Sequence, residues 1–151
     1  GFQMQMMQFQ EERMCAAALV LKALELCIDS TIEYTQERHA FGKPLLDNQL
    51  IHAKLAEMQM EVEALRALIY HTCELYIAGE DPTKQASFAK LKAGQLTRQI
   101  PSDCLQFWGG MGFMWDNIVS RMYRDLRITA SGGGADEVML SIIGKRMGLA
   151  K

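Results

Sequence analysis

The chain has 151 residues, of which 49% are hydrophobic and 23% are charged, and its formal net charge is -2 at pH 7. This length provides one sizeable hydrophobic core, and the balanced charge excludes a disordered tail and a basic nucleic-acid-binding protein. The sequence contains no apolar run as long as a membrane span, and its first ten residues lack the features of a signal peptide. We therefore expect a globular protein that is not secreted and has no transmembrane segment.

The cysteines and histidines give no pattern of a metal site. The four cysteines are far apart in the sequence and form no CxxC pair, which predicts buried free thiols in a reducing compartment. The three histidines lack a carboxylate three residues upstream, so the Glu-x-x-His pattern of di-iron bundles is absent. We therefore expect no bound metal. These residues are Cys15, Cys27, Cys73, Cys104, His39, His52 and His71.

Two long helices are predicted in the first half of the chain, over about 7–36 and 47–78, because apolar residues recur there every three or four positions. Gly42 and Pro44 interrupt the pattern between them. The apolar face of the first helix consists of Met14, Ala17, Leu21, Leu24, Ile28 and Thr35. That of the second consists of Ile51, Leu55, Met58, Val62, Leu65, Leu68, Thr72 and Leu75.

The second half predicts a third helix over about 83–107, a short helix over 117–128 and a last helix over 135–147. Pro101 is expected to kink the third helix or to open its hydrogen-bond ladder locally. Strand-like alternation is absent throughout the sequence. The predicted fold is therefore all-α: an up-and-down four-helix-bundle-like domain with an extra short helix.

Two connections carry more chemistry than a helix turn needs. The segment "ERHAFGK" at 37–43 contains Arg38, His39 and Phe41, and "QFWGGMGFMW" at 106–115 combines aromatic residues with glycines. Glycine allows the backbone to approach a flat or anionic ligand closely. The alternative for the second segment is a tight helix corner with its two tryptophans packed in the core, and the sequence leaves both interpretations open.

Taken in order, "ER" at 12–13, "ERHAFGKPLLDNQ", "LQFWGGMGF" and "RDLRITASGGGADEVM" resemble the C-terminal helical domain of acyl-CoA dehydrogenases. The resemblance covers essentially residues 1–151 and is closest in pattern to the long-chain and isovaleryl type. It implies a longer protein with an N-terminal helical domain and a middle β-domain, neither of which is in this chain. The isolated piece is then expected to retain little or no flavin and to be inactive.

The resemblance implies that the cofactor is FAD. Arg38 and Gln49 would reach the FAD of a neighbouring subunit, and the Gln-x-x-Gly-Gly element at 106–110 would hold its other end. A homodimer or homotetramer follows from that sharing. The full set of residues for which the resemblance implies cofactor binding is Arg38, Phe41, Gln49, Gln106, Phe107, Trp108, Gly109, Gly110, Ala135, Asp136 and Glu137.

The resemblance also indicates a catalytic base. Most family members carry a base glutamate within a Tyr-Glu-Gly-Thr pattern, but the corresponding stretch here is Gly132 to Ala135, and Gly133 stands at the glutamate position. The long-chain and isovaleryl members instead carry the base on the first helix, just before an arginine, which Glu12 and Arg13 match. Residues near the substrate would be Gln10, Glu11, Arg13, Gly133 and Gly134.

The implied activity is α,β-dehydrogenation of an acyl-CoA thioester in fatty acid or branched-chain amino acid catabolism. Electron-transfer flavoprotein would be the electron acceptor, in the mitochondrial matrix of a eukaryote or the cytoplasm of a bacterium. Two alternatives stay open: a related flavin-dependent acyl-CoA oxidase, and a non-catalytic helical association domain. In the latter case Glu12 is only a solvated charge at a helix start, and Arg38 a charge favoured by the helix dipole.

Overall fold

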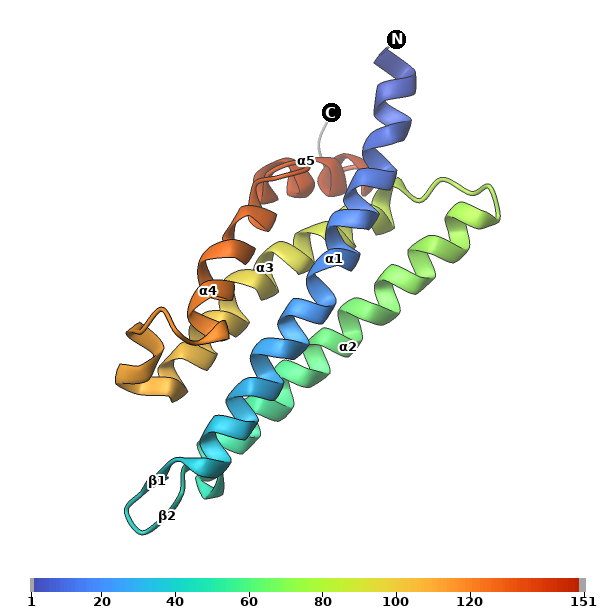
Figure 1. Ribbon diagram of the computed structural model, residues 1–151. Coiled ribbons are helices and arrows are strands. Elements are labelled where there is room, and N and C mark those ends of the chain that lie inside the picture. Colours follow the sequence, from blue (N-terminus) through green and yellow to red (C-terminus); the bar gives the residue numbers. More distant parts are fainter. Residues whose placement is uncertain (1, 150–151) are drawn as a thin grey trace.

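The computed structural model describes the backbone of residues 2–149 and the side chains of residues 8–149. Five α-helices account for most of this part of the chain (Figure 1). In chain order the elements are α1 (Phe2–Glu37), β1 (His39–Ala40), β2 (Lys43–Pro44), the 3-10 helix η1 (Leu45–Asp47), α2 (Gln49–Ile77), α3 (Thr83–Trp108), η2 (Gly109–Phe113), α4 (Ile118–Asp125), η3 (Leu126–Ala130) and α5 (Asp136–Arg146).

Helices α1 to α4 run alternately up and down the long axis of the molecule, and α5 lies across the end where α1 begins (Figure 1). Helix α3 is central, because it packs against α1, α2, α4 and α5. The predicted all-α, up-and-down four-helix-bundle-like domain with an extra short helix is confirmed.

One local prediction was wrong. The segment predicted to be free of strands contains a small antiparallel hairpin, in which His39 pairs with Pro44 and Ala40 with Lys43. Strands of two residues are too short to produce a detectable alternation. The helix predicted over about 83–107 is present as α3, which includes Pro101 and ends at Trp108. The proline nitrogen has no hydrogen to donate, so the hydrogen-bond ladder is open at that one position, and the surrounding face of the helix is buried.

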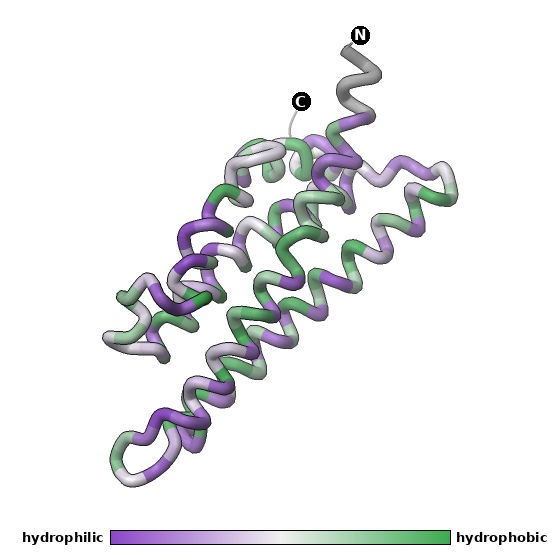
Figure 2. Tube along the Cα trace, in the orientation of Figure 1, coloured by the Kyte–Doolittle hydropathy of each residue, from purple (hydrophilic) through white to green (hydrophobic). Residues whose placement is uncertain are grey.

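The core lies between α1, α2 and α3, and the predicted apolar faces supply most of the α1 and α2 side chains in it. The α3 contribution, for which no face was predicted, consists of Ala89, Ala93, Leu96, Ile100 and Cys104. Figure 2 shows hydrophobic and hydrophilic positions following one another along both long helices. Leu24 and Ile28 of α1 pack in one cluster with Val62 and Leu65 of α2. The threonines of these faces, Thr35 and Thr72, are also buried. Their hydroxyls donate to carbonyls of the preceding turn over 2.8 Å and 2.7 Å, so burial leaves no hydroxyl without an acceptor.

The cysteine prediction holds for part of the set. Cys27 and Cys104 are buried free thiols, and Cys73 is half-buried. Cys15 is exposed, so its predicted burial was wrong. Its position one residue after Met14 turns it about 100° away from the core-facing stripe of α1.

Candidate functional site

The start of α1 combines two buried polar residues with two exposed carboxylates. Gln10 and Arg13 are 9% and 5% exposed, and Arg13 Nη1 donates to Gln10 Oε1 over 3.1 Å. The buried Nε of Arg13 has no hydrogen-bond acceptor among the described residues. Burial lowers the pKa of the Arg13 guanidinium, and the neighbouring Glu12 carboxylate opposes that shift. Arginine nevertheless remains charged, so this end of the bundle holds a buried cation.

The two carboxylates differ in what they contact. Glu11 accepts a hydrogen bond from the Tyr76 hydroxyl of α2, which raises the pKa of that phenol. Glu12 is exposed and makes no hydrogen bond or ion pair with the described residues. The carboxylate predicted to act as the base is therefore the one with no hydrogen-bond or ion-pair partner among the described residues.

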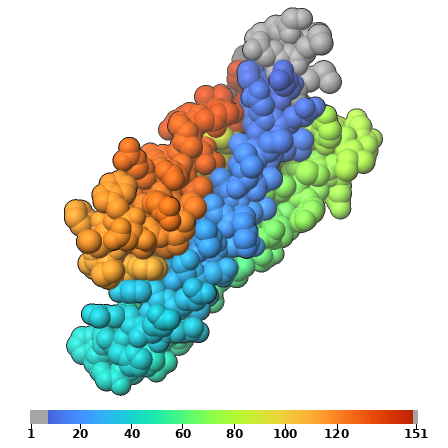
Figure 3. All heavy atoms as spheres, in the orientation of Figure 1, coloured from blue at the N-terminus to red at the C-terminus, as the bar shows by residue number. Residues whose placement is uncertain are grey.

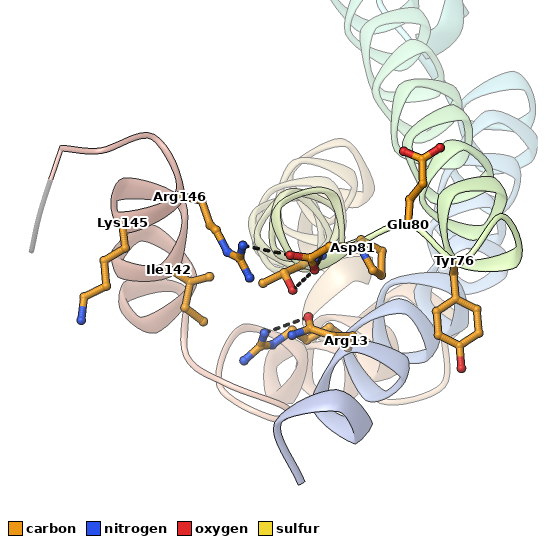
Figure 4. Close-up of a pocket in the computed structure, with 11 residues that line it drawn as sticks. Arg13, Tyr76, Glu80, Asp81, Ile142, Lys145 and Arg146 are labelled. Carbon is orange, nitrogen blue, oxygen red and sulfur yellow. Dashed lines mark hydrogen bonds and ion pairs between the residues drawn. The ribbon is translucent and has the colours of Figure 1, made fainter. Parts of the chain in front are cut away.

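A cavity of about 630 Å³ opens beside the start of α1 (Figure 4). Its walls come from α1, the α2–α3 connection and α5, and Arg146 Nη1 of α5 pairs with Asp81 Oδ2 at 2.9 Å. Hydrogen bonds from Thr83, with the help of the Arg146 charge, lower the pKa of Asp81. Of the residues predicted to contact substrate, Gln10 and Arg13 line this cavity, whereas Glu11, Glu12, Gly133 and Gly134 do not.

The glycine loop between η3 and α5 requires glycine at two positions. Gly133 and Gly134 have φ values of 70° and 112°, in the left-handed region that side chains disfavour. A Cβ on Gly134 would also lie 2.8 Å from Met139 Cε. The loop is bound to α3 by Lys90, whose Nζ donates to the carbonyls of Thr129 and Gly134, each over 2.6 Å.

The residues predicted to lie near the flavin at the start of α5 are in three different environments. Asp136 is 8% exposed, and its Oδ2 accepts from Arg98 of α3, while Oδ1 is buried without a described hydrogen-bond donor. Ala135 is half-buried and Glu137 is exposed. All three line a second cavity of about 610 Å³, together with Arg98, Arg124, Arg127, Ile128, Ala130 and Ser131.

Three other predicted flavin-binding residues lie at the hairpin end of the bundle. Arg38, Phe41 and Gln49 are all exposed, and their side chains make no hydrogen bond or ion pair within the described part of the chain. Phe41 has a φ of 55°, an unusual conformation for a bulky residue, and its ring is completely open to solvent. An exposed aromatic ring and an unengaged guanidinium are both available to another molecule.

The Gln-x-x-Gly-Gly segment divides into an inward and an outward part. Trp108 stacks on Tyr34 with ring centroids 4.2 Å apart, and its Nε1 donates to Thr31 over 3.1 Å. Phe107 is half-buried as well, and Gln106 is exposed. A Cβ added to Gly109 or Gly110 would meet no atom within 4 Å, so that backbone is open to a ligand.

Of the two sequence interpretations of this segment, the packed corner is correct for Trp108. It is wrong for Trp115, which is 65% exposed.

The predicted site residues therefore fall at two ends of an elongated molecule. Glu12 and Arg38 are 26 positions apart on and just after α1, which corresponds to about 39 Å at the helical rise of 1.5 Å per residue. Figure 3 shows the hairpin region in cyan at one end and the part of α1 that follows residue 7 in blue toward the other. The structure does not bring the catalytic candidate together with Arg38 and Gln49 in one chain.

Sequence reasoning missed Lys90 and Arg98, which hold the glycine loop and the start of α5 from α3. Lys90 is fully buried although it is a lysine. One feature of the sequence could have indicated this burial. Ala86, Ala89 and Ala93 lie at helical spacing around Lys90 and are small enough to leave room for its side chain. The carbonyl acceptors, at positions 129 and 134, are too distant in sequence for any periodic pattern to indicate them.

Within residues 2–149 there is no group of three or more His, Cys, Asp or Glu side chains that could hold a metal ion. In the same range no helix is long and apolar enough to cross a membrane.

Comparison with known proteins identifies the family of the chain. Residues 1–148 match the sequence family described as "Acyl-CoA dehydrogenase, C-terminal domain". Over 147 residues the chain is 35% identical to cyclohexane-1-carbonyl-CoA dehydrogenase of Geobacter metallireducens, covering 97% of this chain and 39% of that protein. It is 32% identical to the mitochondrial long-chain specific acyl-CoA dehydrogenase of Sus scrofa, covering 97% and 34%.

A solved structure of butyryl-CoA dehydrogenase from Megasphaera elsdenii superposes with a TM-score of 0.94 at 34% identity, over 97% of this chain and 38% of that one. The chain thus spans less than half the length of the relatives it matches. Because the family match includes nearly all of its residues, the chain belongs to the family of acyl-CoA dehydrogenase C-terminal domains.

Proposed function

We propose that this chain is the C-terminal part of an FAD-dependent acyl-CoA dehydrogenase, which introduces the α,β double bond into an acyl-CoA thioester. The full-length protein would add an N-terminal helical and a middle β-domain. One observation carries the assignment of the base. The glycine loop has no carboxylate between 131 and 135, whereas Glu12 is a free carboxylate beside the buried Arg13.

The start of α1 and the glycine loop are linked electrostatically through α3. The pKa of Lys90 is lowered mainly by burial, and the charge of Arg13 adds to that effect. The same Lys90 ammonium binds the carbonyl of Gly134. We propose that both segments contribute to one substrate site, with Gln10, Glu11, Arg13, Gly133 and Gly134 around Glu12.

In this mechanism Glu12 removes the α-proton of the thioester, a hydride leaves the β-carbon, and the carbon–carbon double bond forms between the two atoms. FAD, when bound, supplies the hydride acceptor. Hydrogen bonds to the thioester oxygen would stabilise the negative charge that develops there.

The residues proposed to bind FAD fit a cofactor shared between subunits. Arg38 and Gln49 have unengaged polar groups, and the backbone at Gly109 and Gly110 is open. Arg38 can donate two parallel hydrogen bonds to a pyrophosphate. A dinucleotide is much shorter than the roughly 39 Å of helix between Glu12 and Arg38. We therefore propose a homodimer or homotetramer in which Arg38 serves the neighbour's FAD.

The acceptor of the electrons is proposed to be electron-transfer flavoprotein. The relatives include a protein named as mitochondrial in Sus scrofa and one from the bacterium Geobacter metallireducens. We accordingly propose the mitochondrial matrix for a eukaryotic source and the cytoplasm for a bacterial one.

The deciding experiment compares Glu12→Gln with wild type in the full-length protein. Removing a general base costs about 10²- to 10⁴-fold in rate, so we expect acyl-CoA-dependent reduction of the flavin to slow by that factor while flavin content is unchanged. Glu33→Gln is the matched control, because Glu33 is also an exposed carboxylate on α1 and has no described partner.

Equal rates for Glu12→Gln and wild type would reject Glu12 as the base. A flavin-free, inert full-length protein would favour the non-catalytic association domain. Rapid reoxidation by oxygen would favour the acyl-CoA oxidase.

A further inference from the structure

Lys90 is a buried cation to which the proposed mechanism assigns no task of its own. It lies in the middle of α3 and is 0% exposed, the largest fully buried side chain in the described part of the molecule. Burying an ammonium group is costly unless its donors are satisfied, so a lysine at such a position needs a compensating set of acceptors.

Those acceptors are the two ends of the glycine loop. Lys90 Nζ donates to Thr129 O, in the last turn before the loop, and to Gly134 O, at the loop's end, each over 2.6 Å. One ammonium group thereby bridges the segment that contains Gly132 and Gly133. A Cβ on Gly133 would lie 4.0 Å from Lys90 Cε, so the aliphatic part of the lysine side chain also lies next to the loop.

The other hydrogen bonds of the loop, from Ser131 N, Ser131 Oγ and Gly132 N to Ile128 O, hold its first half. Gly133 and Gly134 both have positive φ, and glycine loses more conformational freedom on ordering than any other residue. Hydrogen bonds in which the donor is charged are roughly twice as strong as neutral ones. A charged donor from a central helix is therefore an effective way to fix this glycine-rich turn.

The charges around Lys90 come from three elements. Asp136 at the start of α5 stabilises the ammonium form, while Arg13 of α1 and Arg98 of α3 act against it. Arg98 in turn pairs with Asp136. The ammonium group therefore binds the loop within reach of the charges of Arg13 at the start of α1 and Asp136 at the start of α5.

We propose that Lys90 is a positioning residue that holds the glycine loop at 131–134 against the proposed substrate site by binding the carbonyls of Thr129 and Gly134 with one ammonium group. This inference rests on the proposed function for its link to catalysis. The attachment of the loop by Lys90, which we call the loop clamp, depends only on the geometry of α3 and the loop. The clamp and its link to catalysis can therefore be tested separately.

The test uses Lys90→Met in the full-length protein, because methionine keeps most of the buried volume and removes the charged donors. Lys92→Met is the matched control: Lys92 lies on the same helix but pairs with Glu61 of α2 at 2.5 Å, away from the loop. Hydrogen exchange of 129–136 is measured for both variants, together with kcat and KM for an acyl-CoA and the flavin content.

For Lys90→Met we expect exchange of the loop amides to accelerate by about ten-fold or more, since two charged hydrogen bonds are lost. We also expect kcat to fall about ten-fold with a much smaller change in KM and unchanged flavin content. Lys92→Met should match wild type in each measurement. Loop exchange that is the same in Lys90→Met and Lys92→Met would overturn the clamp.

A loosened loop with an unchanged kcat would overturn the positioning role. A loosened loop in a protein whose wild type does not oxidise acyl-CoA would leave the clamp standing and reject the proposed function. If Lys90→Met does not fold, the wild-type protein still decides the question by NMR of its lysine ammonium groups. Protons of Lys90 that exchange with water as fast as those of Lys92 would contradict the bonds to the loop.

Discussion

At the scale of single residues, the thiols show how burial changes chemistry at positions of similar sequence character. Burial raises the pKa of Cys27 to about 12 and that of Cys104 to about 11, from an ordinary value of 9.0. The Cys104 thiol lies 3.9 Å from Met58 Sδ in the core. Cys15, on the outer side of α1, is exposed.

This difference predicts selective alkylation and a specific pH dependence. In the native domain at pH 8, iodoacetamide should modify Cys15 and leave Cys27 and Cys104 unmodified, as mass spectrometry would show. Above pH 9 the unfolded chain releases both thiol protons, whereas the folded chain holds them until about pH 11 and 12.

The unfolded state then binds fewer protons, so the free energy of unfolding should decrease as pH rises through this range. Denaturant titrations at several pH values measure this dependence. The free energy of unfolding of the double variant Cys27→Ala/Cys104→Ala should decrease less with pH than that of wild type, whereas Cys15→Ala should show the wild-type decrease. Rapid native alkylation of Cys104 would contradict the buried position.

At the scale of elements, the contact between α3 and the start of α5 depends on one helical glycine. A Cβ on Gly94 would lie 2.6 Å from Asp136 Oδ1 and 3.2 Å from the Ala130 backbone. Asp136 cannot move freely, because Arg98 binds its other oxygen. Gly144 of α5, in contrast, has no atom within 4 Å of an added Cβ.

Gly94→Ala and Gly144→Ala should therefore have opposite effects on stability. Alanine gains about 1 kcal/mol over glycine inside a helix, but overpacking costs about 1–3 kcal/mol. We expect Gly94→Ala to lower the Tm and Gly144→Ala to raise it, by roughly 2–4 °C per kcal/mol for a domain of this size. Calorimetry of the two variants measures the difference, and a Tm increase for both would mean that α5 does not pack closely on α3.

At the scale of the whole molecule, the length of α1 separates the two groups of proposed site residues. If each active site takes Glu12 from one subunit and Arg38 from its neighbour, two inactive variants should complement one another. In a mixed dimer of Glu12→Gln and Arg38→Ala, the Arg38→Ala subunit keeps its own Glu12 and receives Arg38 from the other subunit. One of the two sites is then intact.

Co-expression of the two full-length variants with different tags, followed by purification of the mixed oligomer, provides the measurement. We expect acyl-CoA dehydrogenase activity in the mixed oligomer well above that of either parent. Activity that stays at the level of the parents would mean that both residues serve the same subunit's site, or that Arg38 has another role.

Much of the architecture was predictable because its causes are local. Ala17, Leu24, Leu55 and Val62 repeat at helical spacing and are buried, so the apolar stripes on α1 and α2 were sufficient to place both helices. Helix starts were also local: Asn48 caps α2 by accepting a hydrogen bond from Leu50 N over 3.0 Å. The hairpin at 39–44 was not predicted, because strands of two residues are too short to show an alternation of hydrophobic and polar residues.

The sequence by itself determined the helices, their order, the all-α class and the family resemblance, since these depend on spacing along the chain. Only the tertiary structure decided that Lys90 is buried and that Trp108 packs inward while Trp115 does not. Each of these facts arises from segments that are distant in sequence and come together when the helices pack. A lysine or tryptophan has the same local pattern in either environment, and its surroundings are fixed only when distant segments pack.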